Sequence, residues 1–225
     1  MSEKVLSLLK DAITGGKHFH IAISGGSTPR ILFEHIAGLP TDPGMWNSAR
    51  IYWVDERCVP PAHEESNYRM ASEFLLRHLG LSHGHIYRIR GEEIPVKEAE
   101  RYASLIHDRV PQKNNIPCFD LVLLGMGRDG HTASIFPDRM DLLESERLCE
   151  VVKHPGSGQI RITLTARIIN NADHVYFLVT GKSKSATLSA ILGNKKDRSR
   201  FPAGHIRPVH GSLEWFLDRD AARLL

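Results

Sequence analysis

Short apolar runs that favour strands alternate along this chain with segments of helical periodicity, and this alternation limits its possible folds more than any other feature. The runs are rich in β-branched and aromatic residues and comprise Phe19–Ser24, Ile51–Asp55, Phe119–Gly125, Ile160–Leu164 and His174–Thr180. Such alternation is typical of βαβ units, in which helices cover both faces of a parallel sheet. We therefore predict an α/β fold with a mostly parallel central sheet.

Two of the runs are apolar on both faces, namely Leu121–Leu124 and Val175–Val179. Because central strands of a parallel sheet are covered by helices on both sides, we expect these two in the middle of the sheet. Ser66 can cap a helix that runs towards Leu79. The stretch Ser212–Leu217 is predicted to be helical and to dock its aromatic side chains onto the body of the protein.

Length and composition indicate one globular domain. The chain has 225 residues, a hydrophobic fraction of 41% and no internal repeat or long linker, so we predict a single domain over residues 1–225. The net charge of +3 suits small anionic ligands but does not indicate a nucleic-acid partner. The basic cluster Lys195, Lys196, Arg198 and Arg200 is interrupted by Asp197, and we interpret it as a solvated loop.

No pattern in the chain indicates a membrane, a disulfide framework or a metal. No apolar run approaches the roughly 18 residues of a membrane span, and no signal-type segment opens the chain. Cys58, Cys118 and Cys149 are odd in number and widely spaced, which favours reduced thiols in the cytoplasm. The closely spaced histidines have no second pair of potential metal ligands nearby in the sequence. We interpret them as surface or packing residues: His18, His20, His83 and His85.

A glycine-rich turn joins the first apolar run to a helical segment. It contains Gly25, Gly26, Ser27 and Thr28, and Pro29 follows in the first helical turn. Its N–H groups and hydroxyls can converge on phosphate oxygens, because helix N-termini favour anions. The Lys-Ser/Thr ending of a nucleotide P-loop is absent, so a sugar phosphate fits better than ATP. A plain strand-to-helix turn would explain the two glycines but not the two hydroxyls.

Charged residues follow other predicted strands. Asp55 and Arg57 lie where the second run ends, and parallel α/β sheets bind ligands at the carboxyl ends of their strands. The Arg57 guanidinium can bind a phosphate or a carboxylate, although a solvated Asp–Arg pair explains the segment equally well. Lys184, in a strand-to-helix turn, and Arg161, near the start of the fourth run, are further candidate cations.

The loop after the third run carries a carboxylate and an imidazole, Asp129 and His131, among Gly125, Gly127 and Gly130. It formally matches Gly-x-Gly-x-x-Gly, but these polar side chains occupy the pyrophosphate turn, which disfavours a dinucleotide site. An imidazole can take a proton from water and return it at neutral pH. We therefore predict catalysis at His131, with a structural loop histidine as the alternative.

Seven segments together resemble the glucosamine-6-phosphate isomerase/6-phosphogluconolactonase family. In order from about residue 19 to the C-terminus, they are ISGGSTPR, WVDERCVP, HEESNYRMA, FDLVLLGMGRDGHTASIFP, RITLTARIINNA, FLVTGKSKSATL and FPAGHIRPVHGSLEWFLDR. The DGHTAS block is the most specific. The resemblance implies a Rossmann-like three-layer α/β/α sandwich. It also implies hydrolysis of 6-phospho-D-glucono-1,5-lactone to 6-phospho-D-gluconate, the second step of the oxidative pentose phosphate pathway, without metal or cofactor.

The resemblance also implies roles for particular residues. His131 would be the general base, while Asp129 or Asp55 would orient the imidazole or the water. The residues that bind the substrate or its phosphate would be Gly25, Gly26, Ser27, Thr28, Arg57, Arg161 and Lys184. Related proteins are often monomeric, so we expect a monomer whose partner is a small phosphorylated lactone. The family usually has an additional strand before the first helix, and we expect this edge strand to be missing here.

Two other functions stay open at this point. Glucosamine-6-phosphate deaminases share the fold, but an essential acidic residue follows their Asp-Gly-His element, whereas Thr132–Phe136 contains none. A sugar-phosphate sensor that regulates transcription would need a DNA-binding segment, for which there is no room before residue 19. Both observations favour the lactonase.

Overall fold

The computed structural model describes residues 1–42, 44–193 and 195–225, and its centre is a parallel sheet of six strands. The strand order across the sheet is β11-β10-β7-β1-β2-β4. In chain order the strands are β1 (Phe19–Ile23), β2 (Ala49–Trp53), β4 (Ile86–Tyr87), β7 (Leu121–Leu124), β10 (His174–Val179) and β11 (Ser212–Leu217). Each neighbouring pair runs parallel, so the predicted mostly parallel α/β fold is confirmed.

Two smaller sheets and several helices complete the fold. An antiparallel sheet has the order β3-β9-β8, with β3 (Asp55–Arg57), β8 (Cys149–Lys153) and β9 (Ile160–Leu164), and a hairpin joins β5 (Gln112–Lys113) to β6 (Ile116–Pro117). The helices are α1 (Ser2–Thr14), α2 (Ser27–Ala37), α3 (Asn67–Phe74), α4 (Pro95–Arg109), α5 (Ala166–Ile169), α6 (Ser185–Leu192), α7 (Lys195–Arg198) and α8 (Arg219–Ala222). Short 3₁₀ turns, among them η5 (Lys182–Lys184), link these elements.

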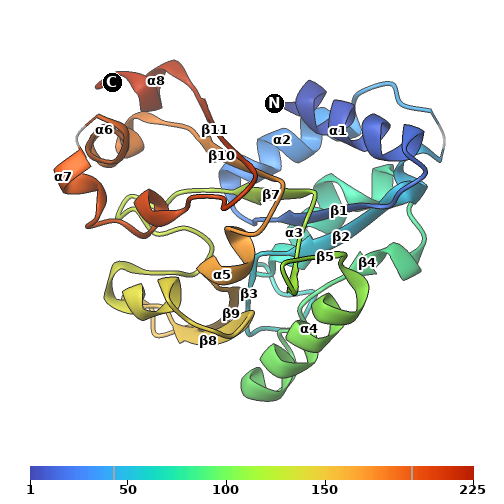
Figure 1. Ribbon diagram of the computed structural model, residues 1–225, viewed down its shortest axis with the longest axis horizontal. Coiled ribbons are helices and arrows are strands. Elements are labelled where there is room, and N and C mark those ends of the chain that lie inside the picture. Colours follow the sequence, from blue (N-terminus) through green and yellow to red (C-terminus); the bar gives the residue numbers. More distant parts are fainter. Residues whose placement is uncertain (43, 194) are drawn as a thin grey trace.

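Helices lie on both sides of the central sheet. In Figure 1, α1 and α2 lie above the sheet, whereas α4, α5 and the small antiparallel sheet lie below it. The strands β1 and β7 are buried at every position, because both of their faces are covered. Their side chains belong to one hydrophobic cluster that extends across the described residues. No described helix has both the length and the apolar character needed to cross a membrane.

Two expectations about local structure are wrong. Ser212–Leu217 is the edge strand β11 rather than a helix, and Trp215 stacks on Phe177 of β10 with ring centroids 4.0 Å apart. Alternating Leu213, Trp215 and Leu217 also fit the period of a strand, and tertiary pairing decides the outcome. Ile160–Leu164 is a strand, but it pairs antiparallel outside the central sheet.

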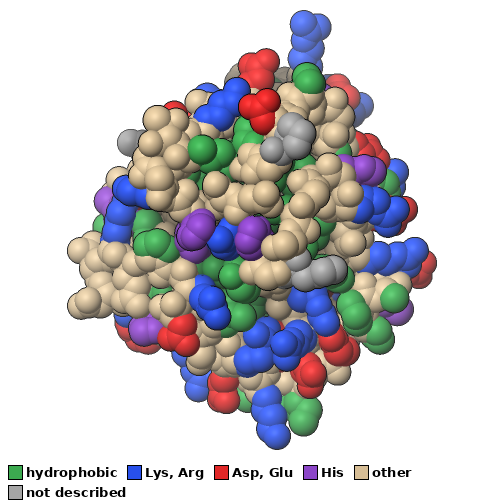
Figure 2. Space-filling model, turned by 90° about the vertical axis from the view of Figure 1, so that its right-hand side faces the viewer, with side chains coloured by type: hydrophobic (Ala, Val, Ile, Leu, Met, Phe, Trp, Pro, Cys, Tyr) green, Lys and Arg blue, Asp and Glu red, His purple; other side chains and the backbone are tan. Residues whose placement is uncertain are grey.

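The expected loop around the basic cluster is also wrong, because residues 195–198 form the short helix α7. Arg198 donates a hydrogen bond to the Gly204 carbonyl, and Arg200 is exposed. The side chains of His83, Lys195 and Lys196 lie outside what the structure describes. On the side of the molecule that Figure 2 shows, basic and acidic side chains are interspersed.

The strand order reverses direction between β1 and β7. The chain proceeds from β1 outward to β2 and β4, and then returns to build β7, β10 and β11 on the other side. Loops that leave the carboxyl ends of β1 and β7 therefore diverge and open a crevice, which is where α/β sheets of this kind bind ligands.

The buried His20 makes stability depend on pH. Burial, together with the charges of His18 and Arg50, lowers the pKa of His20 from 6.5 to about 4, and its ring stacks on Tyr52. Between pH 6.5 and about 4, His20 is protonated in the unfolded chain but not in the folded chain. The free energy of unfolding therefore falls as the pH decreases over this interval. We expect a loss of about 3 kcal/mol over this interval from His20.

Urea unfolding of the wild type and of His20→Gln at several pH values tests this expectation. The variant should lose less stability between pH 6.5 and about 4 than the wild type does. His78→Gln is the control, since His78 is exposed and is not among the groups that shift the pKa of His20. Equal pH slopes for the wild type and His20→Gln would contradict the assignment to His20.

Candidate active site

A crevice of about 420 Å³ lies at the carboxyl edge of the central sheet, over the reversal point between β1 and β7. It is lined by the ends of β1 and β10, the start of β3 and β9, and the loop after β7. Its charged lining residues are four cations and one carboxylate: Arg57, Arg128, Arg161, Lys184 and Asp55. This excess of positive charge suits an anionic ligand.

The glycine turn forms one wall of the crevice. Gly26 is the N-cap of α2 with φ 106°, a backbone conformation that favours glycine, and Ser27 and Thr28 open the helix. The Thr28 hydroxyl lies 3.0 Å from the Thr180 hydroxyl at the end of β10. Pro29 occupies the first turn as predicted. The N-terminus of an eleven-residue helix therefore faces the crevice with its unpaired N–H groups.

Asn67, the first residue of α3, packs directly against the glycine turn. A Cβ at Gly25 would lie 1.8 Å from Asn67 Oδ1, so this close approach requires glycine. Asn67 Nδ2 donates to the Asp55 carbonyl at 2.9 Å and to the Asp55 carboxylate at 3.3 Å. Asn67 is 2% exposed, and its Oδ1 has no hydrogen-bond partner among the described residues. A free acceptor therefore borders the crevice.

Asp55 is held rigidly at the start of β3. Its carboxylate accepts hydrogen bonds from Ser134 Oγ at 2.6 Å and from Asn67 Nδ2. The side chain is buried but still lines the crevice. Two donors from distant segments thus fix the orientation of this carboxylate.

Arg57 and Arg161 lie directly opposite each other on the antiparallel strands β3 and β9. Like charges in this arrangement repel each other, and an anion between them relieves the repulsion. Arg57 Nε is buried without a described partner, while Arg161 Nε donates to Gln159 at 3.1 Å. Burial and the charge of Arg57 lower the pKa of Arg161, and Asp55 opposes this effect. The pair makes one wall of the crevice strongly electropositive.

His131 and Asp129 form a close pair in the loop after β7. His131 Nδ1 lies 2.6 Å from Asp129 Oδ1, and the His131 ring packs on Phe136. Burial raises the pKa of Asp129, but its bonds to His131 outweigh this effect and the pKa falls below its usual value. An ionised Asp129 accepts a hydrogen bond from Nδ1–H, and the tautomer with its proton on Nδ1 has a lone pair on Nε2. Since His131 lines the crevice, this arrangement suits a general base.

The loop backbone leaves room for the His131–Asp129 pair because residue 127 is glycine. A Cβ at Gly127 would lie 2.2 Å from His131 Nδ1 and 2.4 Å from Asp129 Oδ1, so only glycine leaves room for the hydrogen-bonded side chains. Gly127 N–H donates to the His131 carbonyl at 2.8 Å and closes the turn. Ala133 has φ 49°, an uncommon value for alanine beside a candidate site.

Lys184 reaches the crevice from η5, just before α6. The side chain is half-buried, and burial and the charge of Arg128 lower its pKa. A ligand anion would favour the charged form of this lysine.

The structure brings together nearly all of the predicted site residues. Those lining the crevice are Gly25, Gly26, Ser27, Thr28, Asp55, Arg57, His131, Arg161 and Lys184, and Asp129 contacts the crevice through His131. No described hydrogen bond joins Asp55 to His131. Residues that the sequence did not single out are Asn67, Arg128, Ser134 and Thr180, because each is ordinary in its local sequence. Arg128 joins the lining of the crevice, while Asn67, Ser134 and Thr180 acquire hydrogen-bond partners only in the folded chain.

The fold and the crevice define an α/β protein with an electropositive crevice beside an Asp–His pair. The family model described as Glucosamine-6-phosphate isomerases/6-phosphogluconolactonase matches residues 1–215. The chain therefore belongs to this family.

Individual relatives agree with this membership. The chain is 41% identical over 207 residues to the 6-phosphogluconolactonase of Haemophilus influenzae, covering 92% of this chain and 87% of that protein. A structure of 6-phosphogluconolactonase from Trypanosoma brucei is 26% identical with a TM-score of 0.88, covering 99% of this chain and 92% of the other. A monomeric glucosamine-6-phosphate deaminase is 19% identical with a TM-score of 0.74, covering 98% and 95%, and shares the fold.

Proposed function

We propose that this chain hydrolyses 6-phospho-D-glucono-1,5-lactone to 6-phospho-D-gluconate, the second step of the oxidative pentose phosphate pathway. The observation that carries the proposal is one crevice that combines an anion-binding helix N-terminus with the Asp129–His131 pair. A phosphorylated lactone needs both, because its phosphate must be held while water attacks its carbonyl carbon. The substrate is thus a small phosphorylated lactone, and the reaction is that of a carboxylic ester hydrolase.

Binding fixes the phosphate end of the substrate. The first turn of α2 supplies N–H groups and the hydroxyls of Ser27 and Thr28, while Lys184, Arg57 and Arg161 supply positive charge. Each charge-assisted contact contributes about 1.5–3 kcal/mol, and several together suffice for micromolar binding. With the phosphate held there, the lactone carbonyl is placed beside His131.

Hydrolysis then requires two proton movements at His131. Nε2 takes a proton from water as the oxygen of that water bonds to the carbonyl carbon, which gives a tetrahedral oxyanion. When the bond between this carbon and the ring oxygen breaks, the ring oxygen receives the same proton. Asp129 holds the imidazole and stabilises its positive charge in between. Arg57 or backbone N–H groups of the crevice stabilise the oxyanion.

Asp55 has a separate task in this mechanism. Its carboxylate is fixed by Ser134 and Asn67 and has no described bond to His131, so we assign it to orienting the water or a substrate hydroxyl. Of the two carboxylates that the sequence left open, Asp129 is the one whose geometry suits holding the base.

A direct comparison of two reactions tests the proposed function. Freshly generated 6-phosphogluconolactone should be hydrolysed well above its spontaneous rate, and ammonia release from glucosamine 6-phosphate should be absent. Ammonia release without lactone hydrolysis would show that the chain is a deaminase and that the proposed lactonase function is wrong. Binding of the lactone without either reaction would indicate a sugar-phosphate sensor. We further propose a monomer that acts in the cytoplasm, with no nucleic-acid partner.

Lys184→Ala should raise KM about 10- to 100-fold and change kcat much less, because a charged contact to the phosphate acts equally in the ground and transition states. Steady-state kinetics measure the split. Lys182→Ala is the matched control, since Lys182 belongs to the same 3₁₀ turn but is exposed and outside the crevice lining. A fall in kcat with KM unchanged would instead place Lys184 in the chemical step.

A further inference from the structure

Three potential metal ligands gather at the edge of the sheet opposite the crevice. Cys118 precedes β7, Asp173 immediately precedes β10, and His210 precedes β11. These three strands are parallel neighbours, so residues that precede them meet at the same, amino-terminal edge. The crevice lies at the carboxyl edge, and the cluster is therefore separate from the proposed active site.

The backbone holds the three segments close together. Asp173 N–H donates to the Phe119 carbonyl at 2.9 Å, and Ser212 N–H donates to the Asp173 carbonyl at 2.9 Å. At Gly211, next to His210, a Cβ would lie 2.2 Å from the Ala172 carbonyl oxygen. The close approach of the His210 segment to Asp173 thus depends on glycine. The backbone that carries the cluster is therefore constrained.

The distances between the donor atoms fit a shared cation. His210 Nε2 lies 3.7 Å from Cys118 Sγ and 3.5 Å from Asp173 Oδ1, and all three atoms lie within 4.8 Å of one another. In a tetrahedral zinc site, with bonds of about 2.0–2.3 Å, neighbouring ligand atoms are about 3.3–3.6 Å apart. A small contraction of the cluster would therefore suffice for coordination.

The arrangement differs from a catalytic Cys-His-Asp relay. In a relay the imidazole contacts the nucleophile through one ring nitrogen and the carboxylate through the other. Here Cys118 and Asp173 both approach the same nitrogen, Nε2 of His210. One sulfur, one nitrogen and one oxygen atom thus form a single cluster, as the ligand atoms around one ion do.

Two features of the cluster show what an incoming cation would have to replace. Lys113 Nζ is ion-paired with Asp173 Oδ1, and burial together with the charge of Asp173 raises the pKa of the Cys118 thiol to about 12. A divalent cation would take the place of the ammonium and release the thiol proton to water. Cys118 is buried, whereas Asp173 and His210 are partly exposed, so an ion can enter and keep a water as its fourth ligand.

We propose that Cys118, Asp173 and His210 bind a divalent cation of borderline softness, with Zn²⁺ as the ion of best fit. Thiolate, imidazole and carboxylate together are a ligand set typical of Zn²⁺ rather than of Mg²⁺ or Ca²⁺. The bound ion ties the edge strand β11 to β10 and β7. Its role is structural, since no residue of the cluster lines the crevice.

Metal binding to the reduced full-length chain tests the proposal. Competition with a chromophoric chelator should give one Zn²⁺ per chain, and Co²⁺ should produce the charge-transfer absorption of a thiolate ligand. Cys118→Ser and His210→Gln should each weaken binding by more than about tenfold, and Cys118→Ser should abolish the absorption. Cys58→Ser, which removes a thiol outside the cluster, should change neither.

Lys113→Met provides a test that loss of folding cannot imitate. It removes the ammonium that competes for Asp173, so it should tighten Zn²⁺ binding about tenfold or more. Zinc should also raise the unfolding temperature of the wild type but not of His210→Gln. The proposal is overturned if wild type gives no thiolate absorption, if Zn²⁺ binding survives both ligand variants, or if Lys113→Met leaves the affinity unchanged.

Discussion

His131→Ala is expected to lower kcat for lactone hydrolysis by about 10²- to 10⁴-fold while KM changes little. In the proposed mechanism the imidazole acts on protons that move in the transition state, whereas the α2 turn and the cations that line the crevice hold the phosphate. Asp129→Asn should lower kcat by a smaller factor, about 10- to 100-fold. It leaves the base in place but removes the charge that orients Nδ1.

The control for this prediction is His63→Ala, which removes an exposed histidine outside the crevice lining. Steady-state kinetics and a circular dichroism spectrum should be recorded for each variant. If folded His131→Ala retains the kcat of the wild type, the base lies elsewhere in the crevice and the proposed mechanism is wrong.

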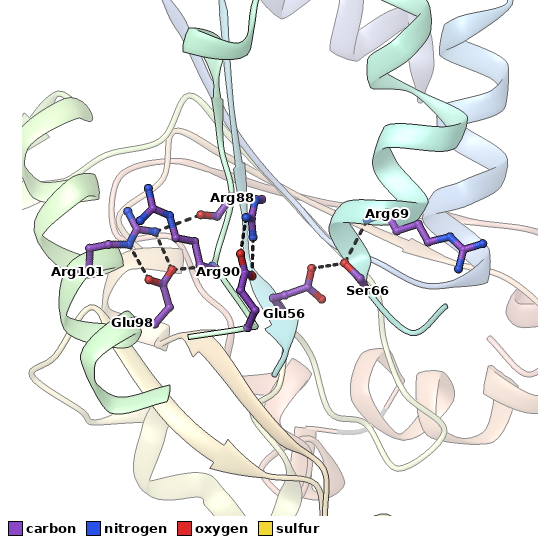
Figure 3. Close-up of polar contacts among 8 residues, drawn as sticks. Glu56, Ser66, Arg69, Arg88, Arg90, Glu98 and Arg101 are labelled. Atoms are coloured by element: carbon purple, nitrogen blue, oxygen red, sulfur yellow. Dashed lines mark hydrogen bonds and ion pairs between the residues drawn. The ribbon is translucent and has the colours of Figure 1, made fainter. Parts of the chain in front are cut away.

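Glu56→Ala should reduce the free energy of unfolding by about 3–5 kcal/mol, the largest stability effect that we expect from a single polar side chain. Glu56 is 2% exposed, and its carboxylate accepts hydrogen bonds from the N–H groups of Arg57, Asn67 and Tyr68 and from Ser66 Oγ. Figure 3 shows the link through Ser66 to Arg69 at the start of α3. Alanine would leave these donors buried and unpaired.

Loss of Glu56 should also affect substrate binding, because the same carboxylate fixes the backbone of Asn67 beside the glycine turn. Urea unfolding measures the stability effect, and KM measures the effect on binding. The exposed Glu64, in the preceding loop, supplies the control variant Glu64→Ala. A loss below about 1 kcal/mol would show that the helix start tolerates water in place of the carboxylate.

The parts of the crevice that could be predicted are those formed by residues close together in the sequence. The Gly25–Thr28 turn and the Asp129–His131 pair each lie directly after an apolar strand. The carboxyl edge of a parallel sheet then brings such loops together without further information. The expectation that β7 lies inside the sheet is also confirmed, since β10 and β1 flank it.

What could not be predicted depends on contacts between distant segments. Asn67 and Ser134 hold Asp55 from 12 and 79 residues away, and neither has a distinctive local pattern. Cys118, Asp173 and His210 likewise have no recognisable metal-binding spacing along the chain. The apolar residues of β11 fit a helix as well as a strand until β10 pairs with them.

In the proposed mechanism, one crevice both holds a phosphate and activates water. A comparison of kcat/KM of the unaltered chain for 6-phosphogluconolactone and for the same lactone without the phosphate tests both roles at once. The phosphorylated lactone should be hydrolysed far above the spontaneous rate. The value of kcat/KM should fall by more than about 100-fold when the phosphate is absent. Equal values for the two lactones, or no acceleration of either, would contradict this mechanism.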